Sequence, residues 1–232
     1  MNHSATNHSA KNNQNKLFWE KEVSTIESAV RYVAYMDVMG FKDMVARNPH
    51  NVIGEKLQKL LIFISDLINN KGSIFSSIFS DSIYFFTSDD KQTTLKSLID
   101  VLSKVMKYAL GVGLPMKGAI AMGDVSVDLV KNLTFGQPLI DAYLIEESVV
   151  LYGVVIHNSV EGIVRKKTFQ DYVLDAKIPL KTGTASHYIL KWWRNDLKKS
   201  KQLVRDIRLS VSDSPRRYID NTLDLMDKDA NK

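Results

Sequence analysis

The chain has 232 residues, of which 44% are hydrophobic, a formal net charge of +5 and no cysteine. Its length and composition fit one compact domain and exclude a disordered polymer or a fibrous repeat. Without cysteine there are no disulfides, thiolate zinc sites or cysteine nucleophiles, so oxygen atoms or histidine must bind any metal. No apolar run reaches the ~18–20 residues of a membrane-spanning helix, so we expect a soluble, cytoplasmic protein with no membrane partner.

The charge distribution argues against a nucleic-acid partner, although the pI is near 9.2. Positive charge is spread along the chain, apart from two short clusters at 165–167 and 198–201. Scattered charge is typical of a solvated surface.

The pattern of apolar residues divides the chain into three parts. Residues 1–16 are polar and are predicted to form a disordered tail, residues 17–195 one folded domain, and residues 196–232 a charged helical extension. Hydrophobic periodicity then predicts the following elements in chain order: a short helix over 17–29, a strand over 31–38, a helix over 52–70, a hairpin of strands 74–79 and 83–86, a helix over 95–110, a strand over 116–122, a strand over 125–130 that pairs with it, a helix over 138–150, strands over 172–176 and 186–192, and helices from residue 196 on.

The elements between residues 31 and 122 have the order βαββαβ. This order is typical of the ferredoxin-like α+β fold, an antiparallel sheet with helices on one face. The other face would be left open for a ligand or a partner.

Two aspartates interrupt these apolar strands. Asp37 lies near the end of the first strand, where an unpaired carboxylate is costly unless it is paired or binds a metal. Asp81 lies at the hairpin tip. Each has a simpler interpretation, Asp37 as the cap of a following helix and Asp81 as an ordinary turn residue. In a βαββαβ sheet the two positions meet, however, and hard oxygen ligands suit magnesium or manganese.

Four segments resemble motifs of the class III nucleotide cyclases. Segment 35–41, Tyr-Met-Asp-Val-Met-Gly-Phe, resembles the Asp-Ile-x-Gly-Phe motif, and segment 79–82, Phe-Ser-Asp-Ser, resembles the Gly-Asp hairpin of that family. Segment 117–123 is similar to the Arg-x-Gly-Ile-x-x-Gly strand, and segment 135–146 to the Gly-x-x-Val-Asn-x-Ala-x-Arg-x-Glu helix. The motifs look most like those of the stand-alone pyrimidine cyclases of bacterial Pycsar anti-phage defence.

The resemblance implies a two-metal phosphoryl-transfer site. Asp37 and Asp81 would be the catalytic residues and would bridge two Mg²⁺ or Mn²⁺ ions, with the Val38 carbonyl as a further ligand. The enzyme would convert CTP or UTP into 3′,5′-cyclic CMP or cyclic UMP plus diphosphate. It would act as a homodimer with active sites at the interface, and a separate effector protein would sense its product.

The same resemblance suggests nucleotide contacts. Gly40 and Phe41 would place backbone N–H groups at a helix start against the triphosphate. Lys117 and Lys181 would supply positive charge, and Tyr35 shares the strand face of Asp37. Two alternatives stay open at this point: Tyr35 is a core aromatic, and Lys117 is an exposed charge at a strand end.

Two departures from the family pattern bear on the substrate. Ile140 and Leu144 stand where purine cyclases carry Asn and Arg, and the purine-reading positions fall near Ser77 and Leu133. These residues disfavour adenine and guanine. The alternative functions are a catalytically inactive cyclase-fold module that binds nucleotide or dimerises, and a nucleic-acid binder.

Overall fold

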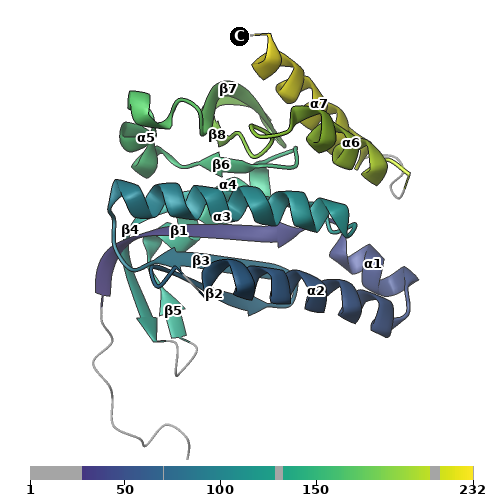
Figure 1. Ribbon diagram of the computed structural model, residues 1–232, viewed down its shortest axis with the longest axis horizontal. Coiled ribbons are helices and arrows are strands. Elements are labelled where there is room, and N and C mark those ends of the chain that lie inside the picture. Colours follow the sequence, from purple (N-terminus) through teal and green to yellow (C-terminus); the bar gives the residue numbers. More distant parts are fainter. Residues whose placement is uncertain (1–27, 70, 129–132, 210–214, 232) are drawn as a thin grey trace, which may run out of the picture.

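The computed structural model describes residues 28–69, 71–128, 133–209 and 215–231. The predicted tail at 1–16 and residues 17–27 of the predicted first helix lie outside these ranges. Residues 28 and 29, assigned to that helix, instead begin the first strand. The elements, shown in Figure 1, are β1 Ser28–Val38, α1 Phe41–Arg47, α2 His50–Ile68, β2 Ile74–Phe79, β3 Ser82–Thr87, α3 Gln92–Gly111, β4 Met116–Asp128, β5 Leu133–Phe135, α4 Gln137–Ser148, β6 Val154–Ile156, α5 Asn158–Val164, a 3₁₀ turn Lys167–Phe169, β7 Val173–Leu180, β8 Gly183–Leu190, α6 Leu197–Ile207 and α7 Arg216–Ala230.

The predicted fold class is confirmed. One sheet has the strand order β2-β3-β1-β4-β6-β8-β7, with β5 paired to β4, and the central strands β3, β1 and β4 are antiparallel neighbours. Helices α2 and α3 lie side by side over one face (Figure 1). Tyr32, Ala34 and Met36 of β1 are fully buried in the main core on this face, as a period of two requires.

The opposite face is not left open, which corrects one detail of the prediction. Helix α4 packs there against β1 and β4. Ala119 and Ala121 of β4 and Ala142 of α4 share a small second core with Tyr35. Three small side chains let the helix lie close to the sheet, a long-range fit that the periodicity of α4 alone could not reveal.

Strand β4 differs from its prediction as well. It runs without a break from Met116 to Asp128 along β1, so the separate strand expected at 125–130 is wrong over its described residues. The strand that pairs with this end of β4 is β5. One pair in the sheet, β4 with β6, is parallel.

The helical prediction beyond residue 196 is confirmed over the described residues by α6 and α7, and both helices join the main core. Val204 and Ile207 of α6 and Ile219, Leu225 and Met226 of α7 are buried there. Helix α6 contacts α3, and α7 contacts β7. The boundary at residue 195 stays a prediction. Within the described ranges, every helix is too short or too polar to cross a membrane.

Candidate active site

The end of β1 and the β2–β3 turn bring the two predicted aspartates together. In the sheet register Asp37 is the partner of Ser82, and the Val38 N–H donates to the Asp81 carbonyl at 3.2 Å. Both side chains are half-buried. Burial is the main cause that raises the pKa of Asp37, and the negative charge of Asp81 raises it further, against the Ser82 hydrogen bond and Lys117. Two carboxylates that repel each other in this way favour a bound cation.

The turn between β2 and β3 is strained. It consists of Ser80 and Asp81, and Ser80 has a φ of +57°. This left-handed conformation favours glycine and disfavours residues with a Cβ. Such strain is often found at functional sites, and here it sets the position of Asp81 at the tip of the hairpin.

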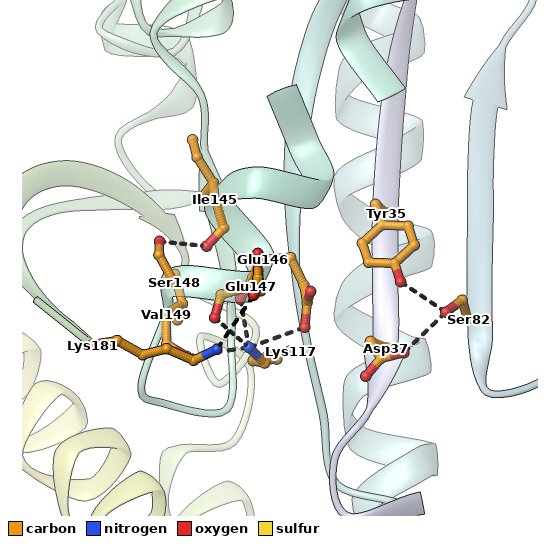
Figure 2. Close-up of polar contacts among 10 residues, drawn as sticks. All are labelled: Tyr35, Asp37, Ser82, Lys117, Ile145, Glu146, Glu147, Ser148, Val149 and Lys181. Atoms are coloured by element: carbon orange, nitrogen blue, oxygen red, sulfur yellow. Dashed lines mark hydrogen bonds and ion pairs between the residues drawn. The ribbon is translucent and has the colours of Figure 1, made fainter. Parts of the chain in front are cut away.

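Tyr35, Ser82 and Asp37 form a chain of hydrogen bonds (Figure 2). The Tyr35 hydroxyl lies 2.8 Å from Ser82 Oγ, and Ser82 Oγ donates to Asp37 Oδ1 at 2.9 Å. The Asp37 carboxylate does not cap the following helix. The N-cap residue of α1 is Gly40, and no side chain accepts a capping hydrogen bond from the first turn of that helix.

Tyr35 is a buried aromatic, as one of its two interpretations predicted. It is 6% exposed, with ring centroids of Tyr84 and Tyr143 at 5.0 and 5.5 Å. Burial is the main cause that raises the pKa of its hydroxyl. Its contact with a nucleotide stays a prediction.

Lys117 is buried, so its interpretation as an exposed strand-end charge is wrong. It is 4% exposed because the C-terminal end of α4 lies over β4. Its Nζ donates to the Glu146, Glu147 and Val149 carbonyls at 2.5, 3.3 and 3.4 Å and lies 3.1 Å from Glu146 Oε1. These contacts, drawn in Figure 2, make Lys117 a cap for α4.

The environment of this ion pair perturbs both partners. Burial lowers the pKa of Lys117 and raises the pKa of Glu146 to about 7. Lys117 is also the register partner of Asp37 on the neighbouring strand, and its positive charge favours the ionised form of that aspartate. Lys117 therefore supplies charge next to the aspartates, although its donors are already engaged.

Lys181 lies beside the same end of α4 but remains accessible. Its Nζ is 3.8 Å from Glu147 Oε1, and its side chain is 49% exposed. Its backbone N–H donates to the Ser148 carbonyl at 2.8 Å. The fold thus gathers both predicted lysines at one place (Figure 2), with Lys181 the one free to move towards a ligand.

Gly40 and Phe41 lie at the junction of β1 and α1, with Met39 between the strand and Gly40. Gly40 has a φ of +73°, and it is exposed, while Phe41 is half-buried against the main core. The left-handed glycine turns the chain from β1 into α1 within three residues of Asp37.

The donor set next to the aspartates consists of oxygen atoms. Asp37 and Asp81 supply carboxylates, and Val38 supplies a backbone carbonyl between them. Over the described residues no three His, Cys, Asp or Glu side chains converge as a metal cluster. This set fits Mg²⁺ or Mn²⁺, which retain water and substrate phosphate among their ligands.

A cavity of about 480 Å³ lies between the β2–β3 hairpin, β5 and α4. Its lining is mostly apolar and includes no charged side chain, and its polar members, which each carry a hydroxyl group, are Ser77, Tyr84, Thr134 and Tyr143. Thr134 lines this cavity, whereas the sequence pointed to its neighbour Leu133. Ile140 and Leu144 of α4 are 53% and 54% exposed, and Ile140 also lines the cavity.

The sequence reasoning missed three residues with a direct part in this site. Ser82, Glu146 and Thr134 were present in or beside the motifs, but no role was assigned to them. The signal for Ser82 was available, because Ser82 directly follows Asp81 and begins β3, the strand that pairs with β1. The roles of Glu146 and Thr134 depend on the packing of α4 and β5, which local sequence patterns do not reveal.

The fold is similar to that of solved adenylyl and guanylyl cyclase domains. Among solved structures, it resembles the adenylyl cyclase CyaB from P. aeruginosa, with 12% identity and a TM-score of 0.55 over 71% of this chain and 94% of that one. The guanylate cyclase domain of RhGC from Catenaria anguillulae in complex with GTP has 13% identity and a TM-score of 0.54 over 71% of this chain and 98% of that one.

A monomeric guanylyl cyclase domain of the RhoGC fusion protein from the aquatic fungus Blastocladiella emersonii gives 12% identity and a TM-score of 0.57 over 72% of this chain and 97% of that one. At this identity the likeness establishes the fold. No protein-family model and no curated protein matches the sequence.

Proposed function

We propose that this protein is a nucleotide cyclase that requires a divalent metal ion. The observation that carries the proposal is the juxtaposition of Asp37 and Asp81 at the end of β1, in a sheet with the architecture of cyclase catalytic domains. In the reaction, the ribose 3′-hydroxyl gives its proton to water, and its oxygen forms a bond to the α-phosphorus of a nucleoside triphosphate. The bond from that phosphorus to the bridging oxygen breaks, and diphosphate leaves with its electron pair.

The roles of the chain's own residues follow from their positions. Asp37, Asp81 and the Val38 carbonyl would hold two Mg²⁺ or Mn²⁺ ions, which when bound lower the pKa of the 3′-hydroxyl and neutralise charge on the departing diphosphate. The accessible ammonium of Lys181 would bind the triphosphate, and backbone N–H groups after Gly40 would add donors. Lys117, held by α4, would contribute charge without a direct contact.

We infer a pyrimidine substrate, CTP or UTP. The cavity beside the aspartates offers hydroxyl groups, which both donate and accept, and it has no charged side chain of the kind that purine-reading pairs supply. Ser77 of β2 and Thr134 of β5 both line this cavity. The solved neighbours named above are adenylyl and guanylyl cyclases, so the pyrimidine assignment rests on the residues of this chain.

The proposal includes a homodimer whose active sites lie at the shared interface. Large apolar side chains are exposed around the cavity, with Phe79 at 78% and Phe135 at 51%, and this concentration suits a second copy of the chain. The cyclic nucleotide would act as a second messenger in anti-phage defence and would be read by a separate effector protein.

An assay with each radiolabelled NTP and Mn²⁺ tests the proposal. We expect cyclic CMP or cyclic UMP from the wild-type chain, and at least a hundredfold loss for Asp37→Asn and Asp81→Asn. Asp43→Asn, on the exposed first turn of α1, is the matched control and keeps full activity. The absence of cyclic product from every NTP, or full activity in Asp81→Asn, would refute a cyclase.

Ile140 and Leu144 support a second candidate, a cyclase-fold module that binds nucleotide without turnover. Neither side chain can orient a ribose by hydrogen bonds or stabilise phosphate charge, and both are exposed. Nucleotide binding in calorimetry together with the absence of product would establish this alternative.

A further inference from the structure

We propose that Tyr35 and Ser82 are positioning residues that act as one unit on Asp37, and that they hold its carboxylate in the orientation that binds the metal ion. This inference rests on the proposed metal-dependent function and deepens it. It concerns two residues outside the metal ligands, and it assigns the Tyr35 hydroxyl a role other than a contact with the nucleotide.

The direction of each hydrogen bond in the chain follows from the chemistry of its groups. An ionised carboxylate can only accept, so Ser82 Oγ must donate its single proton to Asp37 Oδ1 at 2.9 Å. That proton is then used, and the 2.8 Å contact between the two hydroxyls requires Tyr35 to donate to Ser82. The sequence of donors is therefore Tyr35 to Ser82 to Asp37.

Each hydroxyl is itself held by packing. Ser82 is the register partner of Asp37 on β3, and Tyr84, two residues further along β3, is the register partner of Tyr35. The Tyr35 ring is fixed by contacts with Tyr84 and Tyr143. Because the Tyr35 hydroxyl occupies a lone pair of Ser82 Oγ, it restricts the rotation that would turn the serine proton away from Asp37.

The arrangement leaves part of Asp37 for the metal. Ser82 engages Oδ1, and no hydrogen bond to Oδ2 from the described residues is seen. A ligand carboxylate whose second oxygen is tied down loses less rotational freedom when the ion binds. Removal of such supporting contacts costs metal affinity or activity by about 10–100-fold.

The test measures metal affinity directly. Free Mn²⁺ is followed by electron paramagnetic resonance during titration of the full chain, alone and with α,β-methylene CTP or UTP, which cannot be cyclised. We expect Ser82→Ala to raise the dissociation constant for Mn²⁺ by about 10–100-fold and Tyr35→Phe by a smaller factor. Ser82→Thr keeps the hydroxyl and restores wild-type affinity.

Two features of the result separate positioning from a general structural role. Tyr35→Phe in the Ser82→Ala background has no further effect on Mn²⁺ affinity, because the tyrosine acts only through the serine. Ser103→Ala and Tyr108→Phe, which remove hydroxyl groups from α3, leave the affinity unchanged whatever they do to the melting temperature. In the cyclase assay, excess Mn²⁺ returns the kcat of Ser82→Ala towards the wild-type value.

The outcomes also distinguish this inference from the proposed function. Unchanged Mn²⁺ affinity in Ser82→Ala, additive effects in the double variant, or a wild-type chain that binds no Mn²⁺ would each overturn the positioning role. A wild-type chain that binds Mn²⁺ with the expected losses in the variants, but forms no cyclic product, supports positioning and overturns only the cyclase.

Discussion

Replacement of Lys117 by methionine tests its role as the cap at the C-terminal end of α4. Methionine is close to lysine in length and apolar volume, so the packing of the buried stem is retained. The substitution removes the ammonium that contacts one carboxylate and three carbonyl groups. A buried charge left without its partner costs about 3–5 kcal/mol, and we expect Lys117→Met to lower the free energy of unfolding by this amount at pH 8.

The destabilisation caused by Lys117→Met should depend on pH, because Glu146 changes its protonation state near neutral pH. Its folded pKa is about 7, above the usual value of 4.5, so the folded state takes up a proton as the pH falls through this range. The contribution of Glu146 to stability is therefore complete below pH 4.5 and is lost as the pH rises past 7. Without Lys117 the neutral form is favoured further, and the effect of Lys117→Met should be smaller at pH 5.5 than at pH 8.

Urea denaturation at the two pH values measures both effects. Lys181→Met is the matched control, since its exposed ion pair with Glu147 is 3.8 Å long and such pairs contribute about 0–1 kcal/mol. A destabilisation below 1 kcal/mol for Lys117→Met at pH 8, or a destabilisation that is larger at pH 5.5 than at pH 8, would refute the assignment of Lys117 as a cap for α4.

Three further predictions concern backbone strain, close packing and the C-terminal helices. Ser80 in the β2–β3 turn has a φ of +57°, so Ser80→Val should destabilise the protein by about 1–2 kcal/mol and Ser80→Gly should be neutral or slightly stabilising. Thermal denaturation measures both variants, and a clear loss of stability in Ser80→Gly would contradict the strain. A Cβ on Gly118 would lie 2.4 Å from the Tyr35 carbonyl oxygen, whereas a Cβ on Gly54 in α2 would meet nothing within 4 Å. In chemical denaturation, Gly118→Ala should therefore lower the free energy of unfolding by about 1–3 kcal/mol, and Gly54→Ala should raise it by up to about 1 kcal/mol. Thr222→Val removes the acceptor of the buried Tyr152 N–H at 2.9 Å and should cost about 1–3 kcal/mol; an unchanged urea midpoint would show that this hydrogen bond contributes little to the attachment of α7.

The region around the two aspartates was the part of the site that the sequence predicted best. Asp37 interrupts an apolar strand, and Asp81 lies in a hairpin turn whose two flanks are themselves short apolar runs. Strand period and turn length are local properties, and the antiparallel pairing of β1 with β3 then brings these positions together. Their adjacency therefore followed from the sequence, and the structure confirms it.

The burial of Lys117 was not predictable from its local sequence. Nothing in the sequence around Lys117 indicates burial, and one prediction placed it at an exposed strand end. Its environment is made by Glu146, 29 residues away along the chain, and by the carbonyl groups at the end of α4. Which helix end lies over which strand depends on the fit of Ala142 against Ala119 and Ala121, and this fit appears only when the chain is folded.

By itself, the sequence determined the α+β fold class and the order of its central elements, and it predicted a single domain with an all-oxygen site built on two aspartates. Composition and short-range periodicity are enough for these conclusions, because they depend on the chemistry of the side chains and on local backbone geometry. Only the tertiary structure decided that α4 closes part of the second sheet face, that β4 is continuous, and that α6 and α7 join the core. Those features depend on contacts between distant segments, and the free energy of such contacts is set by shape and burial.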